Sequence, residues 1–190
     1  SGDVAIGAGS TLSVGGITTT STFDGGLSGA GGLTKVGSGI LNLTGINGIT
    51  GDTLVSGGTL DLSGSLGSSN VNVGNGGTLT GTGSLLGTLN VNSGGHLSLS
   101  SGNQLSASSL VLGAGSNMDV ALGTPSTSSL LNVGGNLTLD GSLNVTDAGG
   151  FGVGVYRLIN YTGSLVDLGL DVGAIPVGYS LADLAVQTSV

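Results

Sequence analysis

Apolar residues alternate with polar ones in short runs along this chain, and glycine separates each run from the next. The segments Leu41–Leu43 and Leu60–Leu62 read Leu-Asn-Leu and Leu-Asp-Leu, so every second side chain is aliphatic. This period of two is that of a β-strand with one buried face. Glycine clusters stand before most runs, and glycine tolerates the backbone conformations that tight corners need. The pattern therefore predicts short strands joined by glycine-rich corners.

The same unit recurs about every twenty residues. The apolar residue before each glycine cluster is separated from the next by 22, 19, 18, 18, 21 and 21 residues. A period of two within units, combined with a period near twenty between them, is typical of coils of strands that stack on one another. We therefore predict an all-β fold, a parallel β-helix with about 18–22 residues per coil. The aligned residues are Val14, Val36, Val55, Val73, Val91, Leu112 and Val133.

This alignment predicts two ladders of inward-facing aliphatic pairs. The first holds Leu12/Val14, Val71/Val73, Leu89/Val91, Leu110/Leu112 and Leu131/Val133, and the second holds Leu41/Leu43, Leu60/Leu62, Leu97/Leu99 and Leu137/Leu139. Residues between them should point outward, because successive side chains of a strand face opposite sides. These are Lys35, Asn72, Asn90 and Asn132 on the first face, and Asn42, Asp61, Thr80, Ser98, Asp119 and Thr138 on the second. The recurring asparagines of the first face predict a structural ladder of amides.

The last forty residues depart from the repeat. Four of the five aromatic residues, Phe151, Tyr156, Tyr161 and Tyr179, follow residue 150, although alternation continues over 153–161. Solenoids need distinct terminal units to cover their open ends. We predict β-helix coils over residues 1–150 and a cap-like part of the same β-helix over 151–190.

Charge is scarce and mostly negative in this chain of 190 residues. Ten Asp, no Glu and only two cations, Lys35 and Arg157, give a formal net charge of −8. Two cations cannot neutralise a phosphate backbone, so we expect no nucleic-acid partner. A mean hydropathy of +0.46 argues against a disordered Gly/Ser linker. No stretch has the 18 or more apolar residues that a spanning helix needs.

Candidate chemistry is sparse. His96 is the only histidine, it follows a glycine pair at a strand start, and the chain has no Cys or Glu to join it at a metal. We expect an exposed or corner histidine. Composition leaves a Ser-His-Asp triad open, but the G-x-S-x-G elbow of one triad class is missing.

Paired carboxylates give no stronger signal for catalysis. Asp61 and Asp119 should lie three coils apart on one outward column, about 14 Å at strand spacing, which exceeds the carboxylate separation of glycosidases. The calcium-binding nonapeptide of β-rolls is also missing. We predict no catalytic, cofactor-binding or metal-binding residue. The nearest acidic pairs in sequence are Asp140/Asp147 and Asp167/Asp171.

Residues 32–60 closely resemble the passenger-associated transport repeat of autotransporters, the type V secreted proteins of Gram-negative bacteria. Ile49 stands where the family usually has Tyr, so an apolar residue is kept. The matching positions are Gly32, Leu33, Thr34, Lys35, Gly37, Gly39, Leu41, Leu43, Gly45, Asn47, Thr50, Gly51, Thr53, Val55, Gly58 and Leu60.

A second resemblance lies at 150–188, where residues 154–163 and Gly178–Ser180 are similar to the C-terminal passenger region that often includes an autochaperone-like segment. Together the resemblances imply a right-handed β-helical passenger segment that is displayed at the cell surface after crossing the periplasm and outer membrane. Its outer-membrane β-barrel is expected elsewhere in the parent protein.

The resemblances imply a non-enzymatic adhesin or stalk whose C-terminal part aids folding during secretion. Host or cell-surface glycans, matrix proteins or like chains are the expected partners. Two alternatives stay open: a polysaccharide-active β-helix enzyme and a self-assembling extracellular filament protein.

Overall fold

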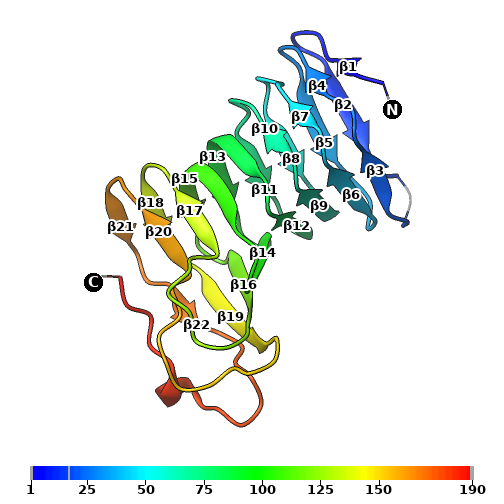
Figure 1. Ribbon diagram of the computed structural model, residues 1–190. Coiled ribbons are helices and arrows are strands. Elements are labelled where there is room, and N and C mark those ends of the chain that lie inside the picture. Colours follow the sequence, from blue (N-terminus) through cyan, green and yellow to red (C-terminus); the bar gives the residue numbers. More distant parts are fainter. Residues whose placement is uncertain (1, 17, 189–190) are drawn as a thin grey trace.

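Three columns of short parallel strands run along the molecule, and each turn of the chain adds one strand to each column (Figure 1). The computed structural model describes residues 2–16 and 18–188. Residues 1, 17, 189 and 190 lie outside the described residues, including the last two of the predicted cap-like part. The fold is the predicted all-β parallel solenoid, here with eight strands in its longest unbroken column. Seven steps at about 4.8 Å correspond to a rod of about 34 Å.

The first column begins with the pair β1 and β4, and it continues through β7 by way of a hydrogen bond from Gly48 N to Leu27 O. Its strands are β1 (Val4–Ala5), β4 (Leu27–Ser28), β7 (Ile46–Asn47), β10 (Ser65–Leu66), the first halves of β13 (Ser84–Val91) and β15 (Leu105–Leu112), β17 (Leu131–Val133) and β20 (Ile159–Tyr161).

The second column holds β2 (Thr11–Val14), β5 (Gly32–Lys35), β8 (Thr53–Val55), β11 (Val71–Val73), the second halves of β13 and β15, β18 (Leu137–Leu139) and β21 (Leu165–Asp167). The third holds β3 (Ser21–Phe23), β6 (Ile40–Leu43), β9 (Gly58–Leu62), β12 (Gly77–Gly81), β14 (His96–Ser100), β16 (Asn117–Leu122), β19 (Ser142–Asp147) and β22 (Asp171–Val172).

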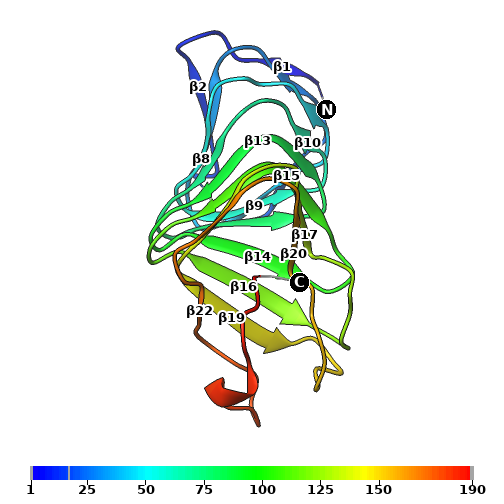
Figure 2. The ribbon, with the colours of Figure 1, turned by 90° about the vertical axis from the view of Figure 1, so that its left-hand side faces the viewer.

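The third-column strands β14, β16 and β19 form one face of the rod, and the C-terminal segment with the short 3-10 helix η1 (Leu181–Asp183) extends beyond the last coil (Figure 2). No helix among the described residues has the length and apolar character needed to cross a membrane.

Stacked aliphatic side chains fill the interior of the rod. The inward pairs Val71/Val73, Leu89/Val91 and Leu110/Leu112 are 0–1% exposed, as the alternation predicted. The first column adds a ladder that the sequence did not single out, with Leu66, Leu85 and Leu105 buried in it. Full burial of each aliphatic side chain contributes about 1.5–3 kcal/mol relative to exposure, so the stacking of coils holds the fold together.

Lys35 corrects the predicted ladder, because it points inward and is 1% exposed. It lies in register with Val14 and Val55, which moves Val36 from the ladder to the corner. Its ammonium donates to Val36 O at 2.8 Å, Gly37 O at 3.0 Å and Gly57 O at 3.0 Å. Burial lowers the pKa of Lys35, because desolvation disfavours its charged form.

The Lys35 ammonium joins the corners of two successive coils, since Gly37 and Gly57 lie one coil apart. The neighbouring Gly58 has a φ of +62°. A Cβ there would collide with the carbonyl oxygens of Gly37 and Gly39 and would also meet Lys35 Nζ at 2.8 Å. Only glycine combines this left-handed conformation with so close an approach. The corner that surrounds the Lys35 ammonium therefore requires glycine at position 58.

Asn47 occupies an inward position of the first column and is 1% exposed. Its Oδ1 accepts from Leu27 N at 3.0 Å, and its Nδ2 donates to Gly45 O and Ser65 O, both at 3.0 Å. One buried amide thus binds the coil before, its own coil and the coil after. Such a satisfied polar group fixes the register at which the coils stack.

The coil length changes after β15, and this overturns part of the predicted ladder. Val133 pairs with Ala107 and Tyr161 in the first column, while Leu137 pairs with Leu110 in the second. Residues 123–130 form a loop that lengthens this coil, so Leu110 and Leu137 are 27 residues apart. The 21-residue step from Leu112 to Val133 therefore joins two different columns.

Two predicted outward positions move with this change. Asn132 pairs with Ser106 and Asn160 rather than continuing the row of Asn72 and Asn90. Thr138 pairs with Val111 in the second column, and Asn144 takes its expected place beside Asp119. The amide ladder itself is confirmed for its first two members, because Asn90 Nδ2 donates to Asn72 Oδ1 at 3.2 Å.

Candidate functional site

The outward face of the third column carries the most concentrated polar network. His96 Nδ1 lies 2.6 Å from Asp119 Oδ2, and their side chains are 39% and 33% exposed. Asn144 Nδ2 donates to Asp119 Oδ1 at 2.8 Å. Strands β14, β16 and β19 of three successive coils position these groups. The network ties coil to coil on the surface.

The sequence missed this pairing because His96 has no acidic neighbour in the chain. Asp119 follows His96 by 23 residues, which is one coil step of 21 residues plus one diagonal displacement of two along the strand. Adding one coil length to the position of each outward residue would have indicated that His96 and Asp119 are neighbours. No hydroxyl among residues 2–16 and 18–188 is hydrogen-bonded to the His96 ring, whose side-chain partner is Asp119.

The acidic residues singled out from the sequence bond mainly to nearby backbone. Asp140 accepts from Gly141 N at 2.6 Å, and Asp147 accepts from Gly149 N at 2.7 Å. Asp167 accepts from Gly169 N at 3.1 Å. These carboxylates stabilise corners. Among residues 2–16 and 18–188, no group of three or more His, Cys, Asp or Glu side chains is arranged to hold a metal ion.

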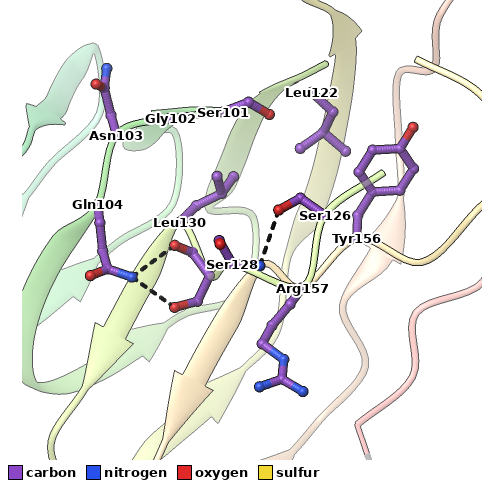
Figure 3. A pocket seen from close by; sticks show the side chains of 11 residues that line it. Ser101, Gly102, Asn103, Gln104, Leu122, Ser126, Ser128, Leu130, Tyr156 and Arg157 are labelled. Carbon is purple, nitrogen blue, oxygen red and sulfur yellow. Dashed lines mark hydrogen bonds between the residues drawn. The ribbon is translucent and has the colours of Figure 1, made fainter. Parts of the chain in front are cut away.

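A small pocket of mixed polar and apolar lining opens beside the loop over residues 123–130 (Figure 3). It has a volume of about 270 Å³ and lies between this loop, residues 101–104 and residues 156–157. Serine hydroxyls and amides line it, Leu122, Leu130 and Tyr156 supply its apolar part, and Arg157 lies at its edge. Sequence analysis did not find this site, because the three segments lie about twenty residues or more apart in the chain and share no motif.

Hydrogen bonds hold the walls of this pocket in place. Gln104 Nε2 donates to the Ser129 carbonyl and hydroxyl oxygens, both at 3.0 Å. Ser101 Oγ accepts from Gly123 N at 3.0 Å, and Ser126 Oγ accepts from Ser128 N at 3.1 Å. The backbone N–H of Arg157 donates to Ser126 O at 3.0 Å. A site whose groups are already ordered loses less entropy when it binds.

The C-terminal end of the solenoid contains a second, mostly apolar cavity of about 740 Å³. Side chains from the last coils and residues 151–158 and 183–188 line it. The predicted aromatic residues gather here: the Phe151 ring stacks on Tyr156 with centroids 5.1 Å apart and meets the edge of Tyr179 at 5.0 Å. Tyr156 OH also accepts from Gly152 N at 2.9 Å. The rings therefore cluster at the end of the rod; whether they act as a cap stays a prediction.

Comparison with known proteins supports the resemblance found near residues 32–60. The family model described as passenger-associated-transport-repeat matches residues 33–62. This segment contains the two buried polar side chains described above, Lys35 and Asn47, and Ile49, the position that departs from the family pattern, is fully buried.

A relative points the same way. The chain is 48% identical over 106 residues to the protein named adhesin BmaC autotransporter of Brucella suis biovar 1 (strain 1330). The matched region covers 55% of this chain and 3% of that protein, so the chain spans a small part of its relative's length. The repeat, the relative and the fold together support an autotransporter passenger domain.

Proposed function

We propose that the chain is a non-enzymatic segment of a surface-displayed autotransporter passenger, a stiff β-solenoid that contributes adhesion. The main support for the proposal is the match of residues 33–62 to the transport repeat. In the structure these residues form coils that hydrogen bonds from Lys35 and Asn47 join to the neighbouring coils. The name of the 48% identical relative, an adhesin, supports the adhesive role.

The physical character of the rod suits such a role. Each coil pairs only with its neighbours, so a solenoid folds by successive addition of coils and resists bending once stacked. The absence of Cys means that no disulfide loop blocks passage of an extended chain through a secretion pore. We assign the segment to the surface of a Gram-negative bacterium, with the C-terminal part over 151–190 aiding folding during secretion.

A polysaccharide-active enzyme is the less favoured alternative. Glycosidases place two carboxyl groups about 5–9.5 Å apart around the bond they cleave. Asp61 and Asp119 occupy one outward column, with Thr80 and Ser98 on the rungs between them. Three coil steps separate these carboxylates by about 14 Å. The other alternative, a filament, would show light scattering that rises with protein concentration.

The proposal is tested by displaying residues 1–190, with an N-terminal epitope, from an unrelated translocator in a laboratory Gram-negative strain. We expect the epitope at the cell surface, a protease-resistant core, and more binding to immobilised glycans and matrix proteins than with the epitope alone. Asn42→Ala serves as the matched control for Asn47→Ala, which should lose the resistant core. Surface display without any binding would reduce the segment to a stalk and contradict the adhesive role.

A further inference from the structure

The two cations of this protein have opposite surroundings. The Lys35 ammonium is buried and donates three hydrogen bonds to backbone carbonyls. Arg157 is exposed, and no hydrogen bond or ion pair joins its guanidinium to any other residue in 2–16 or 18–188. In a chain with net charge −8, the exposed one of the two Lys and Arg residues lies at the edge of the small pocket described above, beside the loop over residues 123–130.

From this placement we infer that the pocket binds the carboxylate-bearing sugar of an acidic glycan, with Arg157 as the anion-binding residue. This inference rests on the proposed adhesive function and names its ligand class. A guanidinium presents two parallel N–H donors that match the two oxygens of a carboxylate. The pocket volume of about 270 Å³ suits one small ring better than an extended ligand.

The rest of the pocket matches a pyranose ring. Ser128 offers a hydroxyl to the ring hydroxyls of a sugar, and the Gln104–Ser129 hydrogen bonds fix one wall. Tyr156, which Phe151 covers on one ring face, supplies the partly exposed apolar surface for the C–H face of a sugar, and Leu122 and Leu130 are buried beside it. Binding sites of this kind combine an apolar surface with a few placed polar groups that set orientation.

Charge favours a carboxylate over a phosphate. A phosphate monoester carries about −1.5 to −2 charges at pH 7, whereas a uronate or sialate carries one. The pocket has one guanidinium, that of Arg157, and the protein has a net charge of −8. A second negative charge on the ligand would therefore have no cationic partner and would be repelled by the protein as a whole.

The test is an NMR titration of the full isotope-labelled chain with sodium glucuronate, and in a second arm with the methyl glycoside of sialic acid. Glucose serves as the neutral match of glucuronate. We expect shifts at Arg157 Nε, the Gln104 side-chain amide and the amides of Ser126–Ser129, with glucuronate or sialate binding at least tenfold tighter than glucose. The arm with the larger affinity identifies the source of the carboxylate. Binding should weaken between 50 mM and 500 mM salt, because screening acts on exposed charges.

Three variants keep the test independent of folding. Arg157→Gln should weaken binding at least tenfold, while its backbone bond to Ser126 is retained. Ser128→Phe fills the pocket without removing a hydrogen bond made by the Ser128 side chain, and should abolish the shifts. Thr19→Asp changes the net charge by the same amount as Arg157→Gln at an exposed position in a distant coil, and should leave binding unchanged.

Three results would overturn the inference: equal binding of glucose and glucuronate, tighter binding of inorganic phosphate, or shifts that persist in Arg157→Gln. Cells that display the chain and still adhere in the Arg157→Gln form would remove the pocket from adhesion and leave the proposed function standing. If cells that display the wild-type chain do not adhere, while the chain still binds glucuronate, the proposed adhesive function is contradicted and the inferred ligand of the pocket is retained.

Discussion

Asn47 provides the sharpest test of how the coils are held in register. Replacing it with Ala removes three hydrogen bonds, to Leu27 N, Gly45 O and Ser65 O, from a position that is 1% exposed. The Leu27 N–H is buried, and leaving such a donor unpaired costs about 1–3 kcal/mol. Each lost bond to a carbonyl adds about 0.5–1.5 kcal/mol. We expect Asn47→Ala to lower the free energy of unfolding by about 3–4 kcal/mol.

The measurement is denaturant unfolding followed by circular dichroism, together with hydrogen exchange at the Leu27 amide. A loss of about 3 kcal/mol corresponds to at least a hundredfold faster exchange there. Asn42→Ala is the matched control, because Asn42 bonds only to Thr22 Oγ1 near the surface, and we expect a change within about 0.5 kcal/mol. Equal effects of the two substitutions, or unchanged protection of Leu27, would refute the role assigned to the buried amide.

Asn47→Asp distinguishes the hydrogen bond that the Asn47 side chain accepts from the two that it donates. A carboxylate keeps the acceptor for Leu27 N but faces the Gly45 and Ser65 carbonyls without a proton. That contact disfavours the charged form, so the pKa of the new carboxyl rises on folding and the folded state binds the extra proton. Stability of this variant should therefore increase as the pH falls toward 4, and a pH-independent difference from the wild-type chain would contradict the geometry.

Three further predictions follow from other parts of the fold. Burial lowers the pKa of Lys35, so the folded state loses this proton at a lower pH than the unfolded state. The free energy of unfolding should therefore rise with pH between the lowered pKa and 10.5. Lys35→Met should lack this rise, and parallel curves of stability against pH for the two proteins would refute the prediction. Tyr156→Ala removes a stacked ring and the hydroxyl bond to Gly152 and should cost about 2–4 kcal/mol in a melt, whereas the outward Ser98→Ala should stay within about 0.5 kcal/mol. Asp119→Ala breaks contacts with His96 and Asn144 at a partly exposed position, so its cost should stay below about 1 kcal/mol and shrink in high salt; a larger loss would show that the network does more than join neighbouring coils.

Alternation and glycine spacing were enough to predict a stack of β coils. A strand's side chains alternate strictly, and Leu-x-Leu runs at steps near twenty leave few other ways to bury their apolar faces. The inward pairs from Val71 to Leu112 follow directly from this pattern. The transport repeat at residues 33–62 was equally visible, because its fixed positions are specific in sequence.

The sequence alone could not place Lys35, because charge argues for the surface and only the register with Val14 and Val55 puts this residue inside. Three backbone carbonyls at a corner make that burial tolerable, and carbonyl positions depend on how two coils meet. The loop at 123–130 shifted the later columns for a related reason. A longer coil leaves the pattern of alternation intact and changes only which strand each residue pairs with.

The candidate sites were decided by the tertiary structure. His96 and Asp119 lie on neighbouring coils and bond to each other there. The pocket beside Arg157 is formed by three segments that have no common motif. Sequence periodicity determined that the chain would coil and which faces would be apolar, because burial of aliphatic side chains acts at every second residue. The contacts between coils decided which polar groups lie together. These contacts depend on the length of each coil, and that length is set by the corners and loops rather than by the alternation of the strands.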